Sequence, residues 1–333
     1  MTSDRIHALT TFMIEIDHHQ THNGDGWMLS LRRTVDPEKL DSERHPLLII
    51  PGYGMNSFIF GFHPRGTSME AVLASHGFEV WSVDLRGQGR SRSVGGSLRY
   101  HLEDLVLYDV AAAVRFVVGT TKTRAKDLDL IGCSLGATMM FAHVVCQKEH
   151  HGRRLVNMGG PVRWVQVHPL LRVAFASPRV VEALPFRGTR HLARVALPAL
   201  RRVPWLLSLY LHPSHIDMSR AGELSRTVEN PNRHINADIA RWMNLRDPMI
   251  GGRNIAEELK NIRLPLLTMV ANADGIVPRA TTLWPHETIG SPQKKVVEVG
   301  TDDEPMAHAD MFIHDRAPER VFNPLGDWLS TES

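Results

Sequence analysis

The chain has 333 residues, of which 43% are hydrophobic and 22% charged, and this composition is typical of a globular protein with one large core and room for an insertion. Its formal net charge of +2 argues against an extended nucleic-acid-binding surface. The N-terminal stretch holds acidic residues and no long apolar run, so we expect neither a signal peptide nor a membrane span. Two cysteines, Cys133 and Cys146, cannot form a disulfide framework, and we expect a reducing, cytoplasmic setting.

Strands and helices are predicted to alternate along the chain. Residues 12–17 and 26–33 alternate apolar and polar side chains around a glycine-containing turn, which predicts an antiparallel pair at a sheet edge. Unbroken apolar runs predict buried strands at 46–50, 78–84 and 127–132, and further strands are expected at 154–159, 265–272 and 294–300. Helical spacing of apolar residues marks 102–118, 135–147 and 316–330. This order predicts a parallel sheet with helices on both faces and ligands at the carboxyl ends of its strands.

Residues 161–250 break this alternation. They contain thirteen arginines, no lysine and six acidic residues, a formal charge of +7, and no predicted strand. We interpret them as a helical cap inserted into a core formed by 1–160 and 251–333. The most lipophilic part of this cap contains Trp205 and Leu206, which we expect to contact substrate in an acyl tunnel. The neighbouring arginines leave a second interpretation open, in which the cap makes peripheral contact with an anionic membrane.

The segment Gly132-Cys133-Ser134-Leu135-Gly136 lies between a predicted buried strand and a predicted helix. This is the pattern of a nucleophile elbow, a sharp turn that exposes its central side chain and needs small residues two positions away on each side. The two glycines centre the turn on Ser134. We therefore expect Ser134 to be the nucleophile and Cys133 to pack in the core.

The partners of such a serine follow in the order acid, then histidine. Asp274 comes just after the strand predicted at 265–272, and His308 lies in the loop before the last helix. Each has an ordinary alternative: Asp274 could be a turn residue, and His308 a solvated loop histidine. The reserve candidates are less well placed, because His314 falls within a helical pattern and Asp302 and Asp303 stand too close to the histidine.

Two backbone N–H groups must stabilise the oxyanion that an attacking serine creates. We expect one from Leu135, directly after the nucleophile, and the other from Tyr53 in the glycine-rich loop that follows 46–50. Gly52 beside it is expected to contact substrate, because a glycine lets the backbone approach closely. Neighbouring residues of 17–22 would point to opposite faces of a strand, so we expect no metal site there.

The chain resembles the α/β-hydrolase-fold enzymes. The matching segments are PGYG at 51–54, DLRGQGRS at 84–91, GCSLG at 132–136, NADGIVP at 272–278 and AHADMF at 307–312. Residues 21–33 also resemble the opening strands of the acid-lipase branch. A more distant resemblance links the chain to polyhydroxyalkanoate synthases, which carry cysteine where Ser134 stands here. Many relatives have a histidine before the glycine where this chain has Pro51. This difference concerns the loop that is expected to supply the second oxyanion donor.

The resemblance implies an α/β fold with a mostly parallel eight-stranded sheet, an inserted cap and no cofactor or metal. In the 84–91 loop we expect Asp84 and Arg86 to be structural. The function we expect is cleavage of lipophilic carboxylic esters, as an esterase or lipase, through an acyl-enzyme on Ser134. Acyl transfer and thioester hydrolysis are alternatives, as is a non-catalytic protein that binds a lipophilic ligand. The sequence does not indicate an oligomeric state.

Overall fold

A computed structural model describes residues 13–183 and 208–331 of the chain, with the exception of one side chain, that of residue 218. Its main sheet has the strand order β1-β2-β4-β3-β6-β7-β10-β11, and the short β5 pairs with β2 as a ninth strand. The strands span β1 Glu15–His22, β2 Trp27–Val35, β3 Leu47–Ile50, β4 Val80–Asp84, β5 Arg92–Ser93, β6 Leu128–Cys133, β7 Gly152–Met158, β10 Leu266–Ala271 and β11 Lys294–Val299. From β4 to β11 all neighbouring strands are parallel, and β1 and β2 are antiparallel to their neighbours. The expected mostly parallel sheet is confirmed.

The first strand differs from its prediction. It covers Glu15–His22 instead of 12–17, and most of its side chains are exposed. Its backbone pairs along its whole length with β2, from Glu15 opposite Val35 to His22 opposite Met28. Hydrogen bonds to β2, and not a buried face, determine where this edge strand begins and ends. Polar residues such as its histidines can therefore belong to the strand, which is why the alternation of apolar residues predicted the wrong bounds.

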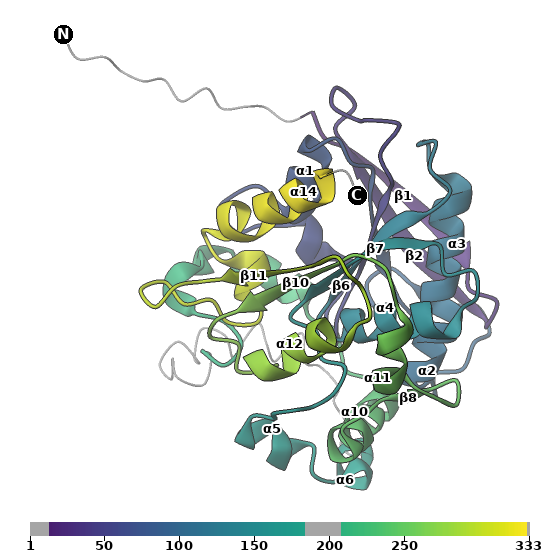
Figure 1. Ribbon diagram of the computed structural model, residues 1–333, viewed down its shortest axis with the longest axis vertical. Helices are drawn as coiled ribbons and strands as arrows, with labels where there is room; N and C mark the ends of the chain where they lie inside the picture. The colour runs from purple at the N-terminus through teal and green to yellow at the C-terminus, as the bar shows by residue number, and fades with distance from the viewer. Residues whose placement is uncertain (1–12, 184–207, 332–333) are drawn as a thin grey trace.

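Helices cover both faces of the sheet. The α-helices span α1 Met69–Ser75, α2 Leu102–Asp104, α3 Ala111–Thr120, α4 Leu135–Cys146, α5 Pro169–Ala174, α6 Pro178–Ala183, α9 Ala221–Leu224, α10 Arg233–Leu245, α11 Ile255–Glu258, α12 Arg279–Thr288, α13 Asp310–Ile313 and α14 Asn323–Ser330. The 3₁₀- and π-helical segments are η1 Ser57–Gly61, η2 Leu105–Val110, η3 Pro213–His215, η4 Met218–Arg220, η5 Ser225–Thr227, η6 Leu259–Asn261 and η7 Pro318–Phe322. Helices α1 and α14 lie over one face, and α3 and α4 over the other (Figure 1), each on its own hydrophobic cluster.

The described part of 161–250 is mainly helical, and α10 packs against α6. Figure 1 shows α5, α6 and α10 grouped together, away from α1 and α14. The expectation of no strand in this region is wrong at its end, because β8 (Met249–Ile250) pairs with β9 (Arg253–Asn254). Gly251 and Gly252 form the turn of this hairpin with φ of 57° and 72°, a conformation that glycine adopts without strain.

Candidate active site

The turn between β6 and α4 is centred on Ser134. Its φ of 54° and ψ of −124° are strained for a residue with a side chain, a cost of about 1–3 kcal/mol. Its backbone N–H donates to the carbonyl of Met158 on β7 at 2.9 Å. A Cβ added at Gly132 would lie 2.3 Å from Cα of Ala137, and one at Gly136 would lie 2.1 Å from the carbonyl oxygen of Ile50. Strand, helix and neighbouring strand are therefore crowded around this serine, which is the steric reason for both glycines.

Cys133, next to this serine, faces the core. Its side chain is fully buried, and its sulfur lies 3.9 Å from the sulfur of Met158. Burial raises the pKa of this thiol well above its usual value, so it stays protonated. Because the thiolate is the nucleophilic form of cysteine, this position is suited to packing and not to attack, as the turn geometry predicts.

Asp274 follows the carboxyl end of β10 and makes two kinds of contact at once. Its Oδ1 accepts hydrogen bonds from the backbone N–H groups of Ile276 and Val277, both at 2.8 Å. Its Oδ2 lies 2.6 Å from Nδ1 of His308. Asp274 is therefore a turn residue before α12, and it also contacts the predicted histidine.

His308 is 5% exposed, so the alternative of a solvated loop histidine is wrong. With the Nδ1 proton directed at Asp274, the tautomer leaves Nε2 able to accept a proton. His308 and Ser134 line the same cavity. Within the described residues no hydrogen bond joins the two side chains, and such bonds commonly tighten when a substrate is bound.

The reserve candidates lie elsewhere. His314 directly follows α13 and stacks on His215, with ring centroids 5.1 Å apart, and it does not line this cavity. Asp302 and Asp303 are exposed in the loop after β11. Neither acid contacts His308, so the structure brings only Asp274 to the imidazole among these candidates.

The loop after β3 lies against the elbow. A Cβ added at Gly52 would be 2.8 Å from both the carbonyl oxygen of Cys133 and Cβ of Ser134, so only glycine allows this approach. The backbone N–H groups of Tyr53 and Leu135 donate to no residue in the described chain. The Tyr53 hydroxyl donates to Oδ1 of Asn236 on α10, and burial raises the pKa of this phenol. Tyr53 and Leu135 line the cavity, whereas Gly52, expected to contact substrate, does not.

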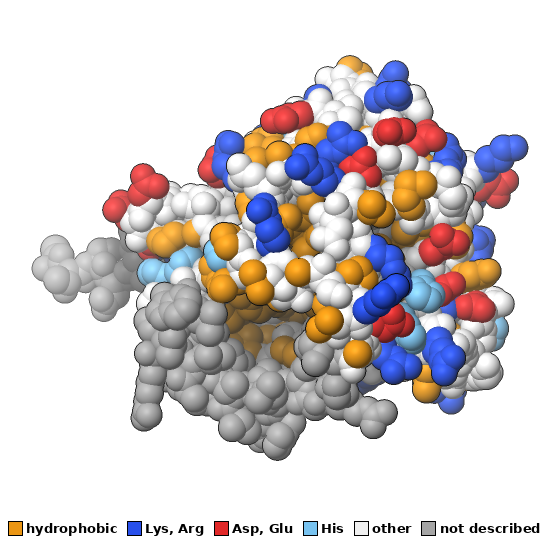
Figure 2. All heavy atoms as spheres, turned by 90° about the horizontal axis from the view of Figure 1, so that it is seen from below, with side chains coloured by type: hydrophobic (Ala, Val, Ile, Leu, Met, Phe, Trp, Pro, Cys, Tyr) orange, Lys and Arg blue, Asp and Glu red, His pale blue; other side chains and the backbone are white. Residues whose placement is uncertain are grey.

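The cavity has a volume of about 200 Å³ and is mainly apolar. The 161–250 region supplies much of its wall, with Trp164, Phe175 and Trp242 among the lining residues. Figure 2 shows apolar side chains gathered in a hollow of the face that is seen from below. No Asp, Glu, Lys or Arg lines it among the described residues. The sequence marked the 161–250 region as a cap but did not single out these residues, because their contacts span distant parts of the chain.

Trp205 and Leu206, expected to contact substrate, lie outside the described residues, and so do the neighbouring arginines, Arg201 and Arg202. The substrate contacts and the membrane contact of the cap thus stay predictions. Within the described residues, no helix is long and apolar enough to cross a membrane. The same residues contain no group of three or more His, Cys, Asp or Glu side chains that could hold a metal ion.

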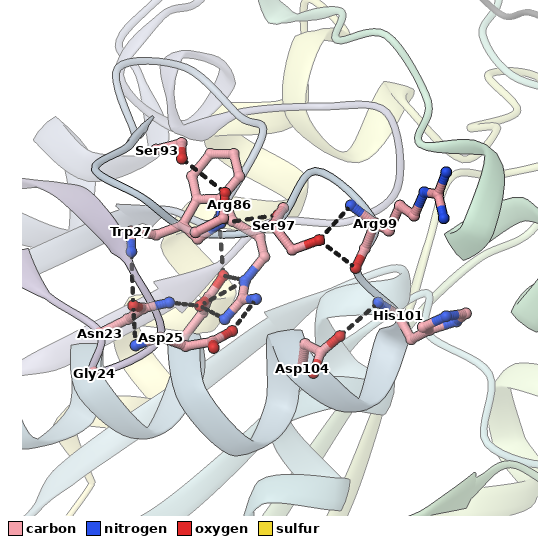
Figure 3. A network of polar contacts seen from close by, with 12 residues as sticks. Asn23, Gly24, Asp25, Trp27, Arg86, Ser93, Ser97, Arg99, His101 and Asp104 are labelled. Carbon is pink, nitrogen blue, oxygen red and sulfur yellow. Dashed lines mark hydrogen bonds and ion pairs between the residues drawn. The ribbon is translucent and has the colours of Figure 1, made fainter.

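Asp84 and Arg86 hold the loop after β4, as expected. The carboxylate of Asp84 accepts from the N–H of Ser57 at 2.8 Å and from that of Arg90 at 2.9 Å. The guanidinium of Arg86 pairs with Asp109 at 2.8 Å and with Asp25 at 2.6 Å. Figure 3 shows the side chains of Arg86 and Asp25 pointing toward one another.

Comparison with known proteins places this chain in a family. The family model described as serine aminopeptidase, S33, matches residues 65–300. Triacylglycerol lipase 1 of Arabidopsis thaliana is 25% identical over 152 residues, which are 43% of this chain and 36% of the lipase. Lysosomal acid lipase/cholesteryl ester hydrolase of Rattus norvegicus is 24% identical over 135 residues, 37% of this chain and 34% of that protein. The matched segments thus span about a third of the length of these curated relatives.

Solved structures show the same fold. An esterase from a Rhodococcus species superposes with a TM-score of 0.65 at 17% identity, covering 95% of this chain and 99% of its own. A thermophilic esterase from Thermogutta terrifontis gives 0.61 at 19% identity, over 94% of this chain and 98% of its own. The family model covers more than two thirds of the sequence and the sheet order is that of the fold. The chain therefore belongs to the serine aminopeptidase S33 family of α/β hydrolases.

Proposed function

We propose that the protein is a serine hydrolase that cleaves carboxylic esters with an apolar acyl group. The observation that carries this proposal is the position of His308, which is held at Nδ1 by Asp274 and lines the same apolar cavity as Ser134. A strained serine at the tip of a strand–turn–helix, an imidazole with a free nitrogen and an acid that orients it are the parts that acyl transfer needs.

In this mechanism the hydroxyl oxygen of Ser134 attacks the acyl carbon while Nε2 of His308 takes its proton. Asp274 keeps the imidazole in the tautomer that accepts at Nε2 and stabilises its positive charge. The N–H groups of Leu135 and Tyr53 donate to the oxyanion. His308 then protonates the departing alcohol, and water, activated by the same histidine, releases the acid from the serine.

Esters are favoured over peptides with a free N-terminus by the charge of the cavity. An aminopeptidase must bind the ammonium group of its substrate, and burying an ammonium without an anionic partner is strongly unfavourable. The described lining offers no carboxylate. A neutral ester with an apolar acyl chain meets no such penalty.

The size of the cavity favours a short acyl chain. Sites for drug-sized ligands commonly measure roughly 300–1,000 Å³, and this cavity is smaller, at about 200 Å³. We therefore expect kcat/KM for p-nitrophenyl esters to rise with chain length over the first few carbons and then to fall. A steady rise to long fatty acyl chains would instead favour a lipase.

The test begins with a fluorophosphonate probe, which labels an activated serine, and with the ester series. Labelling and turnover that are both lost in Ser134→Ala support the proposal, whereas an unlabelled wild-type protein favours the ligand-binding alternative. Added alcohol or thiol acceptors separate hydrolysis from acyl transfer: an acyl product on the acceptor in preference to the free acid would contradict a hydrolase.

A further inference from the structure

A short segment from the 161–250 region crosses the two loops that carry Asp274 and His308. We call residues 209–216 the crossing segment. The carbonyl of Leu209 accepts from the N–H of Gly275, directly after the acid, at 3.1 Å. The carbonyl of Tyr210 accepts from the N–H of Ala309, directly after the histidine, at 2.8 Å. One stretch of backbone is thus bonded to the immediate neighbours of both residues.

Asp310 fastens this segment to the histidine loop. Its side chain is fully buried, and its Oδ2 accepts from the N–H of Ala307 at 2.8 Å. The same oxygen lies 2.8 Å from Nδ1 of His212, whose backbone N–H is 3.1 Å from both carboxylate oxygens. The carboxylate therefore joins the residue before His308 to the crossing segment through charge-assisted hydrogen bonds.

The crossing segment is itself anchored in the core. Leu211 and Ile216 are buried in the hydrophobic cluster under α13. The carbonyl of His215 accepts from the N–H of Asp315 at 2.9 Å. The segment is thus attached on both sides of His212, so it can transmit a fixed position to the histidine loop.

The acid and histidine loops are also joined on the side of the strands, where the N–H of Ala273 donates to the carbonyl of Met306 at 2.9 Å. Within the described residues, no backbone hydrogen bond directly joins the tips of the two loops, the parts that follow Asp274 and His308. The bonds of Leu209, Tyr210 and His212 close this outer side. A shift of either tip would change the 2.6 Å contact between the acid and the imidazole.

We propose that Asp310, paired with His212, is a positioning residue for His308, and that the crossing segment uses this pair to hold the imidazole against Asp274. The proposal rests on the proposed function, since it assigns no chemistry of its own. The pair neither lines the cavity nor contacts the reacting atoms. Its loss is expected to lower kcat and to leave KM nearly unchanged, because the acyl-binding wall is built from other residues.

His212 allows a test in which the donor atom is moved while the rest is kept. In His212→Asn the side-chain amide can place an N–H near the position of Nδ1, whereas in His212→Gln the donor sits one bond farther out. His212→Ala removes it altogether. We expect kcat on a short p-nitrophenyl ester to fall about ten- to hundredfold in the Gln and Ala variants, the range that a displacement near 1 Å can cause. The Asn variant should recover most of the wild-type kcat.

A matched control is His45→Ala. The ring of His45 contacts the carboxylate of Asp127 before β3 and β6 begin, at the opposite end of the sheet from the elbow. Its kcat and KM should equal those of the wild type. The melting temperature of each variant measures any loss of stability. The kcat per probe-titrated site counts only folded, reactive protein, so a fall in this kcat reports lost positioning.

The outcomes separate the two proposals. If the wild-type protein neither labels with a fluorophosphonate nor hydrolyses any ester, the proposed function fails and the positioning role fails with it. If the wild type is active and His212→Gln keeps the wild-type kcat, the positioning role alone is overturned, whatever its melting temperature. Should His212→Ala not fold, the comparison of the Asn and Gln variants decides by itself.

Discussion

Two buried acid–base pairs follow strands at the carboxyl edge of the sheet, and they differ in how many of their polar atoms have partners. Arg86, after β4, donates from its backbone and its guanidinium to Asp109 and from the same guanidinium to Asp25. Asn23 donates to Asp109 as well, at 2.6 Å. In Figure 3 the side chains of Asn23, Asp25 and Arg86 converge on one point. His308, after β11, contacts Asp274 through one ring nitrogen only.

We interpret this difference as one between a structural pair and the reactive pair of the proposed mechanism. Burial raises the pKa of Asp109 against the opposing effect of Arg86, and both oxygens of this carboxylate accept hydrogen bonds. The imidazole of His308 is equally buried, but it borders a cavity that also holds Ser134. A pair with all its hydrogen bonds made can only hold the fold, whereas a pair with one nitrogen open to a cavity can move a proton.

The largest expected effect comes from removing the proposed nucleophile, Ser134, which lines the same cavity as His308. Ser134→Ala should reduce ester turnover by roughly 10⁶-fold, the loss seen when a triad serine is removed. Cys133→Ala should keep most of the activity, because the thiol is buried in the core. Initial rates on a p-nitrophenyl ester and probe labelling measure both. Activity retained in Ser134→Ala and lost in Cys133→Ala would overturn the mechanism.

Asp274→Asn isolates the contact between the acid and the imidazole. The amide oxygen can still accept from Ile276 and Val277, so the turn should survive. The amide nitrogen turned toward His308 would favour the wrong tautomer, at a cost of roughly 10⁴-fold in kcat. Circular dichroism and the melting temperature check the fold, and steady-state kinetics measure the loss. Kinetics close to those of the wild type would show that another acid orients the histidine.

The structural pair should respond in the opposite way. Arg86→Met leaves Asp109 buried without its cation and should lower the free energy of unfolding by about 3–5 kcal/mol. The kcat per probe-titrated site should stay within a few-fold of the wild type, because Arg86 lies outside the cavity. Urea denaturation and active-site titration measure the two quantities. A large fall in kcat with unchanged stability would mean that the roles of the two pairs are misassigned.

The sequence could predict the parts of the site that local geometry determines. The elbow depends on contacts within a few residues of Ser134, so the two glycines beside it predict this turn. The order of Asp274 and His308 along the chain follows from the fold. Local patterns could not show that the Tyr53 hydroxyl bonds to Asn236 or that Asp310 bonds to His212. These contacts join segments that only the folded backbone brings together.

The same limit applies to the fold. Buried strands such as β6 carry an unbroken apolar run and were predicted to within a residue. The exposed β1 carries its polar residues on an edge, where backbone pairing with β2 sets its bounds. The hairpin of β8 and β9 is too short for a period of apolar residues, although the glycine pair at 251–252 marks its turn.

The smallest expected effect concerns a third buried acid, Asp129, at the opposite end of the strand that leads to Ser134. Its Oδ1 accepts from Nε of Arg153 at 3.1 Å, and its buried Oδ2 has no hydrogen-bond partner among the described residues. Burial raises the pKa of this carboxyl to about 6, although the arginines nearby oppose the shift. The pair of Asp129 and Arg153 is therefore less complete than that of Asp109 and Arg86. Because Asp129 does not line the cavity that holds Ser134, we expect it to lower stability and to take no part in catalysis.

The sign of this cost follows from linkage. With a folded-state pKa of about 6 against 3.8 for the unfolded chain, the folded protein holds the proton more tightly, so its stability is greatest below about pH 4 and declines as pH rises through 6. The shift of about two units corresponds to about 3 kcal/mol. Burial lowers the pKa of His143 to about 4, which makes stability rise as pH rises over a similar range, so the wild-type profile alone would mix the two effects.

The difference in stability between Asp129→Asn and wild type removes the contribution of His143. In urea denaturation this difference should shift in favour of the variant by up to about 3 kcal/mol between pH 4 and 7. A difference that stays constant with pH would show that Asp129 is already ionised throughout, and that its pair with Arg153 is as complete as that of Asp109 with Arg86.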